Sequence, residues 1–525
     1  MSPPTVTPLP ADSSVPRDHH GPTSSSSSTG AKTKYFKNPW PSYRTASLKD
    51  AYLAYQLGAA VALPPHQTPG SSRLNLVDMA AYEDEVEDEL LERGREERQS
   101  ILPTATPTSV IGKRLYIRPD FSEVREDDEF DDWREPPVRT VEPKWGDGEQ
   151  DGSGDGGERV TWLGHAGVLV QIPWKDEKRE GMCGVLFDPI FSYRCSPSQY
   201  VGPARYVDPP CTVSMLPEIH VCCISHDHYD HLDYYTIMDL WKYHQNTIHF
   251  FVPMGLKQWF TSSGIPSHRI TQLDWWHESL LSFPSPASSL SFDYPPPVET
   301  GSNPADGQTS GYTPDSPDVL TVKVAFTPAQ HRSGRGVFDH MTTLWGSWCV
   351  GVVEEQDRQS AGERGMRDWE GFKVYFGGDT GYRYATAPEG DDTAICPAFE
   401  QIATHYSPFN LSLLPLSTGS SLPFLRTLLS LSLDQYTLTS SLHCSPADSL
   451  EIHRIIGAER TLGIHWGTFC DAEEARGTRV EFGRCRRRMG VSGVWSGEEE
   501  EDEGRFVVGD IGETLVIPPR PRERS

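Results

Sequence analysis

The chain has 525 residues, a formal net charge of −27 at pH 7, 44 prolines and a hydrophobic content of 36%. This length allows more than one domain, and the composition is typical of a globular core that carries much disordered sequence. The acidic balance argues against nucleic acid as a partner, because phosphate binding needs clustered Lys and Arg. A membrane surface stays open, because one apolar or basic face can dock an acidic protein.

From the sequence we expect neither a targeting segment nor a membrane-spanning helix. No stretch reaches the ~18 consecutive apolar residues of a membrane span. The N-terminus "MSPPTVTPLPADSSVPRDHH" lacks the apolar core of a signal peptide and fits a transit peptide poorly. We therefore expect an intracellular protein, cytoplasmic or peripheral on the membrane of an unidentified organelle. The ten cysteines contain no CxxC motif, which favours reduced, structural thiols.

Low-complexity sequence precedes the main domain. Residues 1–33 are Ser/Pro-rich and predict a disordered tail, and residues 141–158 include the flexible linker "GDGEQDGSGDGGE". Between them, residues 34–140 predict an N-terminal strap with a helix capped by Ser47, followed by the charged helix "YEDEVEDELLERGREERQS". The strap's apolar stretch "AYLAYQLGAAVAL" fits packing on the main domain and also fits membrane docking.

Residues 159–519 contain apolar β-like runs that alternate with predicted helices. This pattern predicts one layered α/β domain. Residues 283–318 and 497–504 predict surface-loop insertions, and 520–525 a tail. A helix is expected after Ser445 as N-cap, with Pro446 at its first position. The β-like runs are "RVTWLGHAGVLVQI", "CGVLFDPIF", "IHVCCIS", "VLTVKVAFTPAQH", "LWGSWCVGVV", "KVYFGGDTG", "TLGIHWGTF", "RFVVGD" and "GETLVIPP".

The stretch "ISHDHYDHLD" follows one of these runs and crowds metal-type residues at a strand end, where α/β folds place their chemistry. His226 and His228 are two residues apart, so their imidazoles can converge on one cation from an extended loop. Asp230 and His231 can turn toward a second cation. Imidazole and carboxylate ligands suit zinc, and also iron or manganese.

Three later β-like runs each end in another metal-type residue: His331 in "PAQH", Asp379 in "GGDTG" and His465 in "GIH". A lone histidine of this kind is more often an ordinary polar or core residue. Three such residues in order, each after a strand, favour the completion of a two-metal site.

These motifs, together with "NPWPSY", "TWLGHAGVLV", "FDPIFS", "SPSQYVGPARY", "LWGSW" and "IHWGTF", resemble the family of N-acyl-phosphatidylethanolamine-hydrolysing phospholipase D. That family lies in the metallo-β-lactamase superfamily, whose signature is HxHxDH. The resemblance runs in colinear order through the main domain. It implies a metallo-β-lactamase-like αββα sandwich.

The resemblance also implies the ligands of two zinc ions. The first set is His226, His228 and His331, the second is Asp230, His231 and His465, and Asp379 bridges both. Two cations would lower the pKa of a bridging water and provide hydroxide for attack on a phosphodiester. Asp230 and Asp379 would be the catalytic carboxylates, and the products would be an N-acylethanolamine and phosphatidic acid. The implied partners are a phospholipid and a peripheral membrane surface, with a homodimer left open.

Other residues carry weaker expectations. Asp188 is expected to support metal-binding histidines by hydrogen bonding, and His165 to lie beside the site or to be an ordinary structural histidine. His443 matches a family position near the substrate head group. Four tryptophans fit a lipid groove or, as is commoner, the core. They are Trp275, Trp276, Trp345 and Trp348.

The segment 417–442 departs from the family, being longer and richer in Leu and Ser, which puts head-group preference in doubt. It fits an apolar flap at the bilayer interface and also fits a buried helix. Two rival functions stay open: a hydrolase of the same fold acting on a lactone, thioester or other phosphodiester, and a non-catalytic membrane or scaffold protein.

Overall fold

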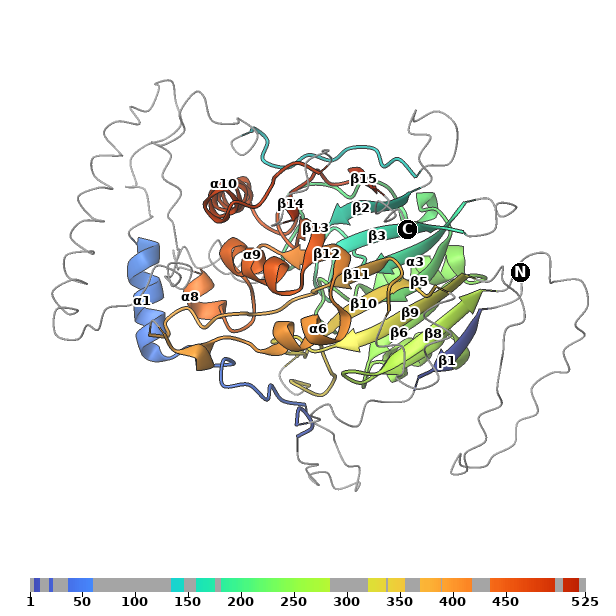
Figure 1. Ribbon diagram of the computed structural model, residues 1–525, viewed down its shortest axis with the longest axis horizontal. Helices are drawn as coiled ribbons and strands as arrows, with labels where there is room; N and C mark the ends of the chain where they lie inside the picture. The colour runs from blue at the N-terminus through green and yellow to red at the C-terminus, as the bar shows by residue number, and fades with distance from the viewer. Residues whose placement is uncertain are drawn as a thin grey trace, which may run out of the picture.

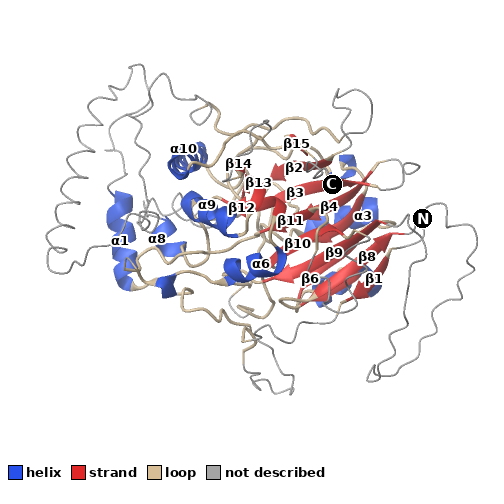
Figure 2. Cartoon of the chain, viewed as in Figure 1, coloured by secondary structure: helices blue, strands red, loops and turns tan. Residues whose placement is uncertain are grey.

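The computed structural model describes residues 4–9, 18–21, 36–59, 134–145, 157–174, 181–283, 320–336, 339–354, 369–388, 390–417, 435–495 and 504–518. These residues form two mixed β-sheets with helices packed outside them (Figure 1; Figure 2). The predicted αββα sandwich is confirmed.

The first sheet has seven strands in the order β15-β2-β3-β4-β5-β6-β7. Its antiparallel half runs from β15 to β4, and β4, β5, β6 and β7 are parallel to one another. The strands are β2 (Glu158–Gly164), β3 (Gly167–Pro173), β4 (Met182–Phe187), β5 (Ile219–Cys223), β6 (His249–Pro253), β7 (Ile270–Leu273) and β15 (Thr514–Ile517).

The second sheet has eight strands in the order β1-β8-β9-β10-β11-β12-β13-β14. It repeats the same plan, antiparallel from β1 to β11 and parallel from β11 to β14. The strands are β1 (Thr5–Pro8), β8 (Glu278–Phe283), β9 (Leu320–Thr327), β10 (Ser347–Val352), β11 (Lys373–Phe376), β12 (Phe409–Pro415), β13 (Ala458–Ile464) and β14 (Arg505–Val507).

Helices cover the outer faces of both sheets. The α-helices are α1 (Leu48–Ala59), α3 (Tyr234–His244), α4 (Lys257–Ser262), α6 (Ala398–Tyr406), α8 (Gln435–Thr439), α9 (Pro446–Ile455) and α10 (Ala472–Met489). Helix α9 packs on β12 and β13 with α6 and α10 beside it, and α1 lies against α8 (Figure 1). Ser445 caps α9 as predicted: the Asp448 side chain accepts from the Ser445 N–H, and the Ser445 hydroxyl accepts from the Asp448 N–H.

Alternating side chains show why these apolar runs become central strands. On β3, Val168 and Val170 face the core between the sheets, whereas Leu169 faces the second cluster, which includes residues of α3 and α4. Leu186 and Cys222 join Leu169 on that outer face. Successive side chains of a strand point to opposite faces, so a strand covered on both faces has to be apolar throughout.

Two parts of the predicted disordered tail are ordered, so the prediction for residues 1–33 is wrong there. Residues 5–8 form β1, an added edge strand on β8. His19 and His20 bind the two oxygens of the Asp274 carboxylate at 2.8 and 2.7 Å. Pairing with an open sheet edge and two buried polar contacts hold these short pieces in place.

The linker prediction is wrong at both of its ends. The Val141 N–H donates to the Ile511 carbonyl at 2.8 Å, which docks residues 141–145 beside β15, and β2 already begins at Glu158. The strap helix is confirmed as α1, with the Asp50 N–H donating to the Ser47 hydroxyl at 3.2 Å. The charged helix, most of the linker, both insertions, the C-terminal tail and residues 418–434 lie outside the described residues.

The four tryptophans belong to the core. Their exposed fractions are 3% for Trp275, 7% for Trp276 and 0% for Trp345 and Trp348, so the lipid-groove interpretation is wrong. All ten cysteines lie in the described part of the chain, and none forms a disulfide. Burial raises the pKa of the Cys222 and Cys223 thiols well above their ordinary value, as expected for structural thiols. Within the described ranges no helix has the length and apolar character to cross a membrane.

Candidate metal centre

Loops from both sheets meet at one edge of the sandwich and bring the predicted ligands together. The HxHxDH loop follows the parallel strand β5 of the first sheet. His331 follows β9, Asp379 follows β11 and His465 directly follows β13, all in the second sheet. Groups that are more than 200 residues apart in sequence therefore face one another between the two sheets.

The first group consists of three imidazoles and one carboxylate oxygen. Nδ1 of His228 lies 2.9 Å from Nε2 of His226 and 3.2 Å from Nε2 of His331. Oδ2 of Asp379 lies 3.6 Å from Nε2 of His331 and 3.9 Å from Nε2 of His226. Three ring nitrogens directed at one another need a shared cation or proton between their lone pairs. This arrangement is typical of a metal site.

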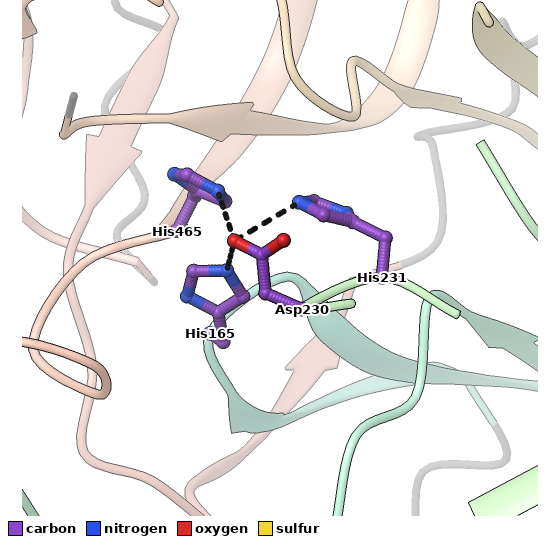
Figure 3. A group of neighbouring side chains, drawn as sticks. All are labelled: His165, Asp230, His231 and His465. Atoms are coloured by element: carbon purple, nitrogen blue, oxygen red, sulfur yellow. Dashed lines mark hydrogen bonds and ion pairs between the residues drawn. The ribbon is translucent and has the colours of Figure 1, made fainter. Parts of the chain in front are cut away.

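The second group surrounds Asp230 (Figure 3). Oδ2 of Asp230 lies 3.0 Å from Nε2 of His165, 3.9 Å from Nε2 of His231 and 4.0 Å from Nε2 of His465. These four residues have ligand atoms close enough to hold one metal ion. His165, which from the sequence was either beside the site or an ordinary structural histidine, therefore lies inside this group.

Asp379 lies between the two groups, and each of its oxygens faces one of them. Oδ1 lies 2.8 Å from Nε2 of His465 and 3.2 Å from Nε2 of His231, while Oδ2 faces the first group. A carboxylate in this position can bridge two cations. The structure thus brings all seven predicted ligands together, and their binding of metal stays a prediction.

Burial controls the charges of the first group. Burial lowers the pKa values of His226 and His331 well below the ordinary value for histidine. Burial also lowers the pKa of His228. These imidazoles are therefore neutral near pH 7, the form that ligates a metal.

For the carboxylates of the centre, neighbouring histidines outweigh the effect of burial on the pKa. Burial alone would raise the pKa of Asp379, but the charges on His231 and His465 hold it well below its ordinary value. Burial likewise opposes ionisation of Asp230, and His231 and His165 hold its pKa low. Burial would lower the pKa of His231, yet Asp379 and Asp230 raise it well above its ordinary value.

Several buried ligand atoms lack an ordinary hydrogen bond. Nε2 of His231 and Nε2 of His465 lie 3.2 and 2.8 Å from Oδ1 of Asp379, but these contacts lack hydrogen-bond geometry, and none of the three buried atoms has another hydrogen-bond partner among the described residues. Buried polar atoms are nearly always satisfied in folded proteins. A cation among them would satisfy all three, so the residues fit the implied metal pair.

Hydrogen bonds from behind orient the ligands. Nδ1 of His231 lies 2.7 Å from Oδ2 of Asp188, and Oδ1 of Asp188 accepts from the Ser225 N–H at 2.7 Å. The Ser225 hydroxyl lies 2.9 Å from Nδ1 of His226. Asp188 thus takes the supporting position that the sequence predicted, because a metal-bound histidine needs a partner for its second nitrogen.

Backbone strain is concentrated at this centre. Asp188, His165 and His465 all have positive φ angles, of 36°, 52° and 60°. The His465 N–H donates to the His165 carbonyl at 2.8 Å, and the His165 N–H donates to the Thr468 hydroxyl at 2.6 Å. Non-glycine residues in this region persist only where the surroundings enforce it, which occurs mainly at functional sites.

His443 borders both groups. Its Nδ1 lies 3.7 Å from Oδ2 of Asp379, and its ring centre lies 5.2 Å from that of His331. Burial lowers the pKa of His443 to about 4, so the ring is neutral near pH 7. A small pocket opens beside the second group, with His165, His465, Phe469 and Glu474 in its lining.

Sequence reasoning missed several residues that support the loops. Asp227, inside the HxHxDH motif, accepts from the Gly334 N–H at 2.7 Å and from the Thr343 hydroxyl at 2.8 Å, which joins two ligand loops. Asn38 contacts the His331 loop from the N-terminal part of the chain, and Gln330 directly precedes His331 within that loop. Amide and hydroxyl residues carry no spacing signal of their own, and only the position of Asp227 within the motif could have drawn attention to it.

A further group of His19, His20 and Asp274 lies apart from this centre. Each imidazole faces a different carboxylate oxygen at hydrogen-bonding distance, and Oδ1 of Asp274 also accepts from the Trp275 N–H at 2.9 Å. Hydrogen bonding alone accounts for this geometry.

Comparison with known proteins agrees with this architecture. The family model described as "Beta-lactamase superfamily domain" matches residues 184–466, more than half of the chain. N-acyl-phosphatidylethanolamine-hydrolyzing phospholipase D 1 of Caenorhabditis elegans is 28% identical over 358 residues, which are 67% of this chain and 74% of that protein. The mitochondrial N-acyl-phosphatidylethanolamine-hydrolyzing phospholipase D of Saccharomyces cerevisiae is 24% identical over 54% of this chain and 44% of its own.

An uncharacterized protein of Mycobacterium tuberculosis is 30% identical over 326 residues, and the chain spans 62% of its length. Among solved structures, a metallo hydrolase of Ignicoccus hospitalis aligns with 69% of this chain and 99% of its own, at 15% identity and a TM-score of 0.35. The diiron β-hydroxylase CmlA of Streptomyces venezuelae aligns with 69% of this chain and 54% of its own, at 15% identity and a TM-score of 0.39.

Proposed function

Because the chain belongs to the β-lactamase superfamily of metallo-hydrolases, we propose that it is a dizinc phosphodiesterase of the phospholipase D type. Its substrate would be N-acylphosphatidylethanolamine, cleaved to an N-acylethanolamine and phosphatidic acid. The observation that carries the proposal is the similarity to the nematode phospholipase over 67% of this chain, together with the two groups of metal-type side chains.

The two ligand groups would hold the cations. His226, His228 and His331 form one site, Asp230, His231 and His465 form the other, and Asp379 has one oxygen toward each. When bound, such a pair supplies Lewis-acid stabilisation of phosphoryl charge and a water of lowered pKa. Zinc suits this mixture, because imidazole nitrogen and carboxylate oxygen are among its usual protein ligands.

The chain's own residues would hold the reacting groups in place. Asp230 is hydrogen-bonded to His165 at 3.0 Å, and its low pKa keeps it ionised, so it is held in place to ligate a cation and to orient an attacking water. His443, neutral and directed at Asp379, is placed to hydrogen-bond a phosphate oxygen of the substrate. The phospholipid would be taken from a membrane surface on which the protein is peripheral.

The test incubates the purified full chain with vesicles of N-acylphosphatidylethanolamine, phosphatidylcholine or a soluble bis-aryl phosphodiester, each with and without chelator. We expect release of N-acylethanolamine and phosphatidic acid from the first lipid only, abolished by chelator and restored by zinc. Turnover of another ester while N-acylphosphatidylethanolamine stays intact would refute the proposal in favour of a different hydrolase of the same fold.

Two histidine variants test whether the activity depends on the predicted metal ligands. His226→Ala removes a buried ligand and should reduce both the bound metal and the rate by several orders of magnitude. His268→Ala removes an exposed histidine at the start of β7 and should behave like the parent chain. Full activity of His226→Ala with its normal metal content would contradict the ligand assignment.

A further inference from the structure

The N-terminal strap, described for residues 36–59, runs along loops that carry residues of the metal centre. It reaches the domain far from its own place in sequence and leads into the blue helix α1 (Figure 1). The Phe36 N–H donates to the Met341 carbonyl at 2.9 Å, and the Arg44 guanidinium pairs with the Asp391 carboxylate at 2.9 Å. Between these two anchors the strap contacts the ligand loops directly.

The Asn38 side chain contacts the backbone of His331, a predicted metal ligand. Its Nδ2 donates to the carbonyl oxygen of His331 at 2.6 Å, across 293 positions of sequence. Nδ1 of His331 donates to the Leu442 carbonyl at 2.9 Å. The ring of this ligand is therefore oriented by the loop that carries His443, and its backbone is held by the strap.

Gln330, the residue before this ligand, joins four segments. It is fully buried, and its side chain accepts from the Ser42 hydroxyl of the strap and donates to the Ser441 carbonyl at 3.2 Å. Its backbone N–H donates to the Thr380 hydroxyl at 3.0 Å, and its carbonyl accepts from the Gly381 N–H at 2.8 Å. The side chain and backbone of Gln330 thereby link the loops of His331, Asp379 and His443 to the strap.

The strap contacts the His443 loop a second time, and it has an aromatic route to the His331 loop. The Ser441 hydroxyl donates to the Arg44 carbonyl at 2.8 Å. Trp40 stacks on Trp275 with ring centres 5.4 Å apart. Trp275 donates to the Trp345 carbonyl at 2.6 Å, and Trp345 donates to the Ala329 carbonyl at 2.9 Å, two residues before His331.

We propose that the strap is a working part of the metal centre, in which Asn38, Ser42 and Gln330 are positioning residues for His331 and His443. A metal site depends on the groups behind its ligands, and losing one of them typically costs about 10–100-fold in metal affinity or activity. The strap supplies such groups to the first ligand group from outside the superfamily domain. For the reaction itself the inference rests on the proposed function, whereas for metal binding it does not.

The experiment replaces Asn38 by Asp in the full chain. This isosteric change puts a carboxylate oxygen where the N–H donor faces the His331 carbonyl, so the contact becomes repulsive. The matched control, Asp391→Asn, removes the Arg44 ion pair and so loosens the strap away from the ligand loops. Zinc affinity is measured by competition with a chromogenic chelator, and the melting temperature of each chelated chain is recorded in parallel.

We expect Asn38→Asp to weaken zinc binding at the first ligand group by about 10–100-fold, while Asp391→Asn keeps the affinity of the parent chain. Ser42→Ala, which deletes a single hydroxyl, is the second variant and serves if Asn38→Asp does not fold. It should also weaken zinc binding. With a hydrolysable substrate the rate at a fixed zinc concentration should fall together with the zinc affinity, and added zinc should restore it.

Two results would overturn the inference. One is parental zinc affinity in a folded Asn38→Asp or Ser42→Ala chain. The other is an equal loss in Asp391→Asn, which would make the strap a general stabiliser. If all variants bind zinc as expected but the parent chain leaves N-acylphosphatidylethanolamine intact, only the proposed function is contradicted. The affinity measurement contains no lipid and therefore tests the inference separately.

Discussion

Asp379 shows how much one side chain decides at this centre. Its two carboxylate oxygens face different ligand groups, Oδ1 toward His231 and His465, and Oδ2 toward His226 and His331. The sequence placed Asp379 after an apolar strand and identified its residue type. The division of its oxygens depends on the packing of β11 between β10 and β12, which no local pattern contains.

This division predicts how two substitutions differ. Asp379→Asn removes the negative charge that the carboxylate presents to both groups and replaces one of its two oxygens by an amide nitrogen that cannot ligate, so both cations should be weakened. His228→Ala alters only the first group and should leave roughly one metal ion per chain after dialysis. Elemental analysis of the dialysed chains measures this directly. A similar metal content in the two variants would show that Asp379 does not bridge.

The residues that sequence reasoning missed differ from those it found by chemistry and not by importance. His226 to His231 are close in sequence and carry the functional groups that bind metals, so the motif is visible on its own. Asn38 and Gln330 are amides that act through hydrogen bonds, one of them across 293 positions. Such contacts have no periodicity or composition by which a sequence could reveal them.

At the scale of elements, strands were predicted well wherever both of their faces are buried. The runs that became β3, β4 and β5 are mainly apolar, with every residue or all but one buried, because the sheets are covered on both sides. Boundaries and edges were predicted poorly. The short edge strand β1 and the docked residues 141–145 have ordinary loop composition, and their order comes from partners in β8 and next to β15.

Strand β6 carries a buried histidine that should make stability depend on pH. Burial lowers the pKa of His249 from its ordinary 6.5 to about 3, with Arg269 and Lys257 acting in the same direction. As pH falls below 6.5, the unfolded chain binds a proton at this position and the folded chain does not. Stability is therefore lost between pH 6.5 and about 3, by roughly 1.4 kcal/mol for each pH unit.

The measurement compares urea unfolding of the parent chain and of His249→Gln, both chelated. Between about pH 7.5 and about pH 5 the parent should lose about 2 kcal/mol more than the variant. The variant keeps a polar group for Thr271, whose hydroxyl lies 2.8 Å from Nε2 of His249. Equal pH dependence of the two chains would contradict a neutral buried His249.

At the scale of the whole molecule, the centre lies where the two sheets meet. The HxHxDH loop belongs to the seven-stranded sheet, and His331, Asp379 and His465 belong to the eight-stranded sheet. Cations held here would tie the two halves of the sandwich together. Their binding free energy would then contribute to the stability of the fold as well as to its chemistry.

Removal of metal should therefore lower the melting temperature. A ligand at 100 times its dissociation constant stabilises a folded protein by about 2.7 kcal/mol, which corresponds to a shift of several degrees. We expect chelator to lower the transition of the parent chain and zinc to restore it, with a much smaller response in Asp379→Asn. Scanning calorimetry measures the effect, and a chelator-insensitive parent chain would argue against metals that bridge the sheets.

The sequence by itself determined the kind of fold and the kind of chemistry. Apolar runs that end in histidine and aspartate specify covered strands with polar loops, because burial and ligand type are local properties of the chain. Only the tertiary structure decided which oxygen of Asp379 faces which group, that His165 enters the second group, that the four tryptophans are core, and that the strap supports His331. These features depend on contacts between distant segments, whose free energy comes from packing and hydrogen bonds that form only when the whole domain folds.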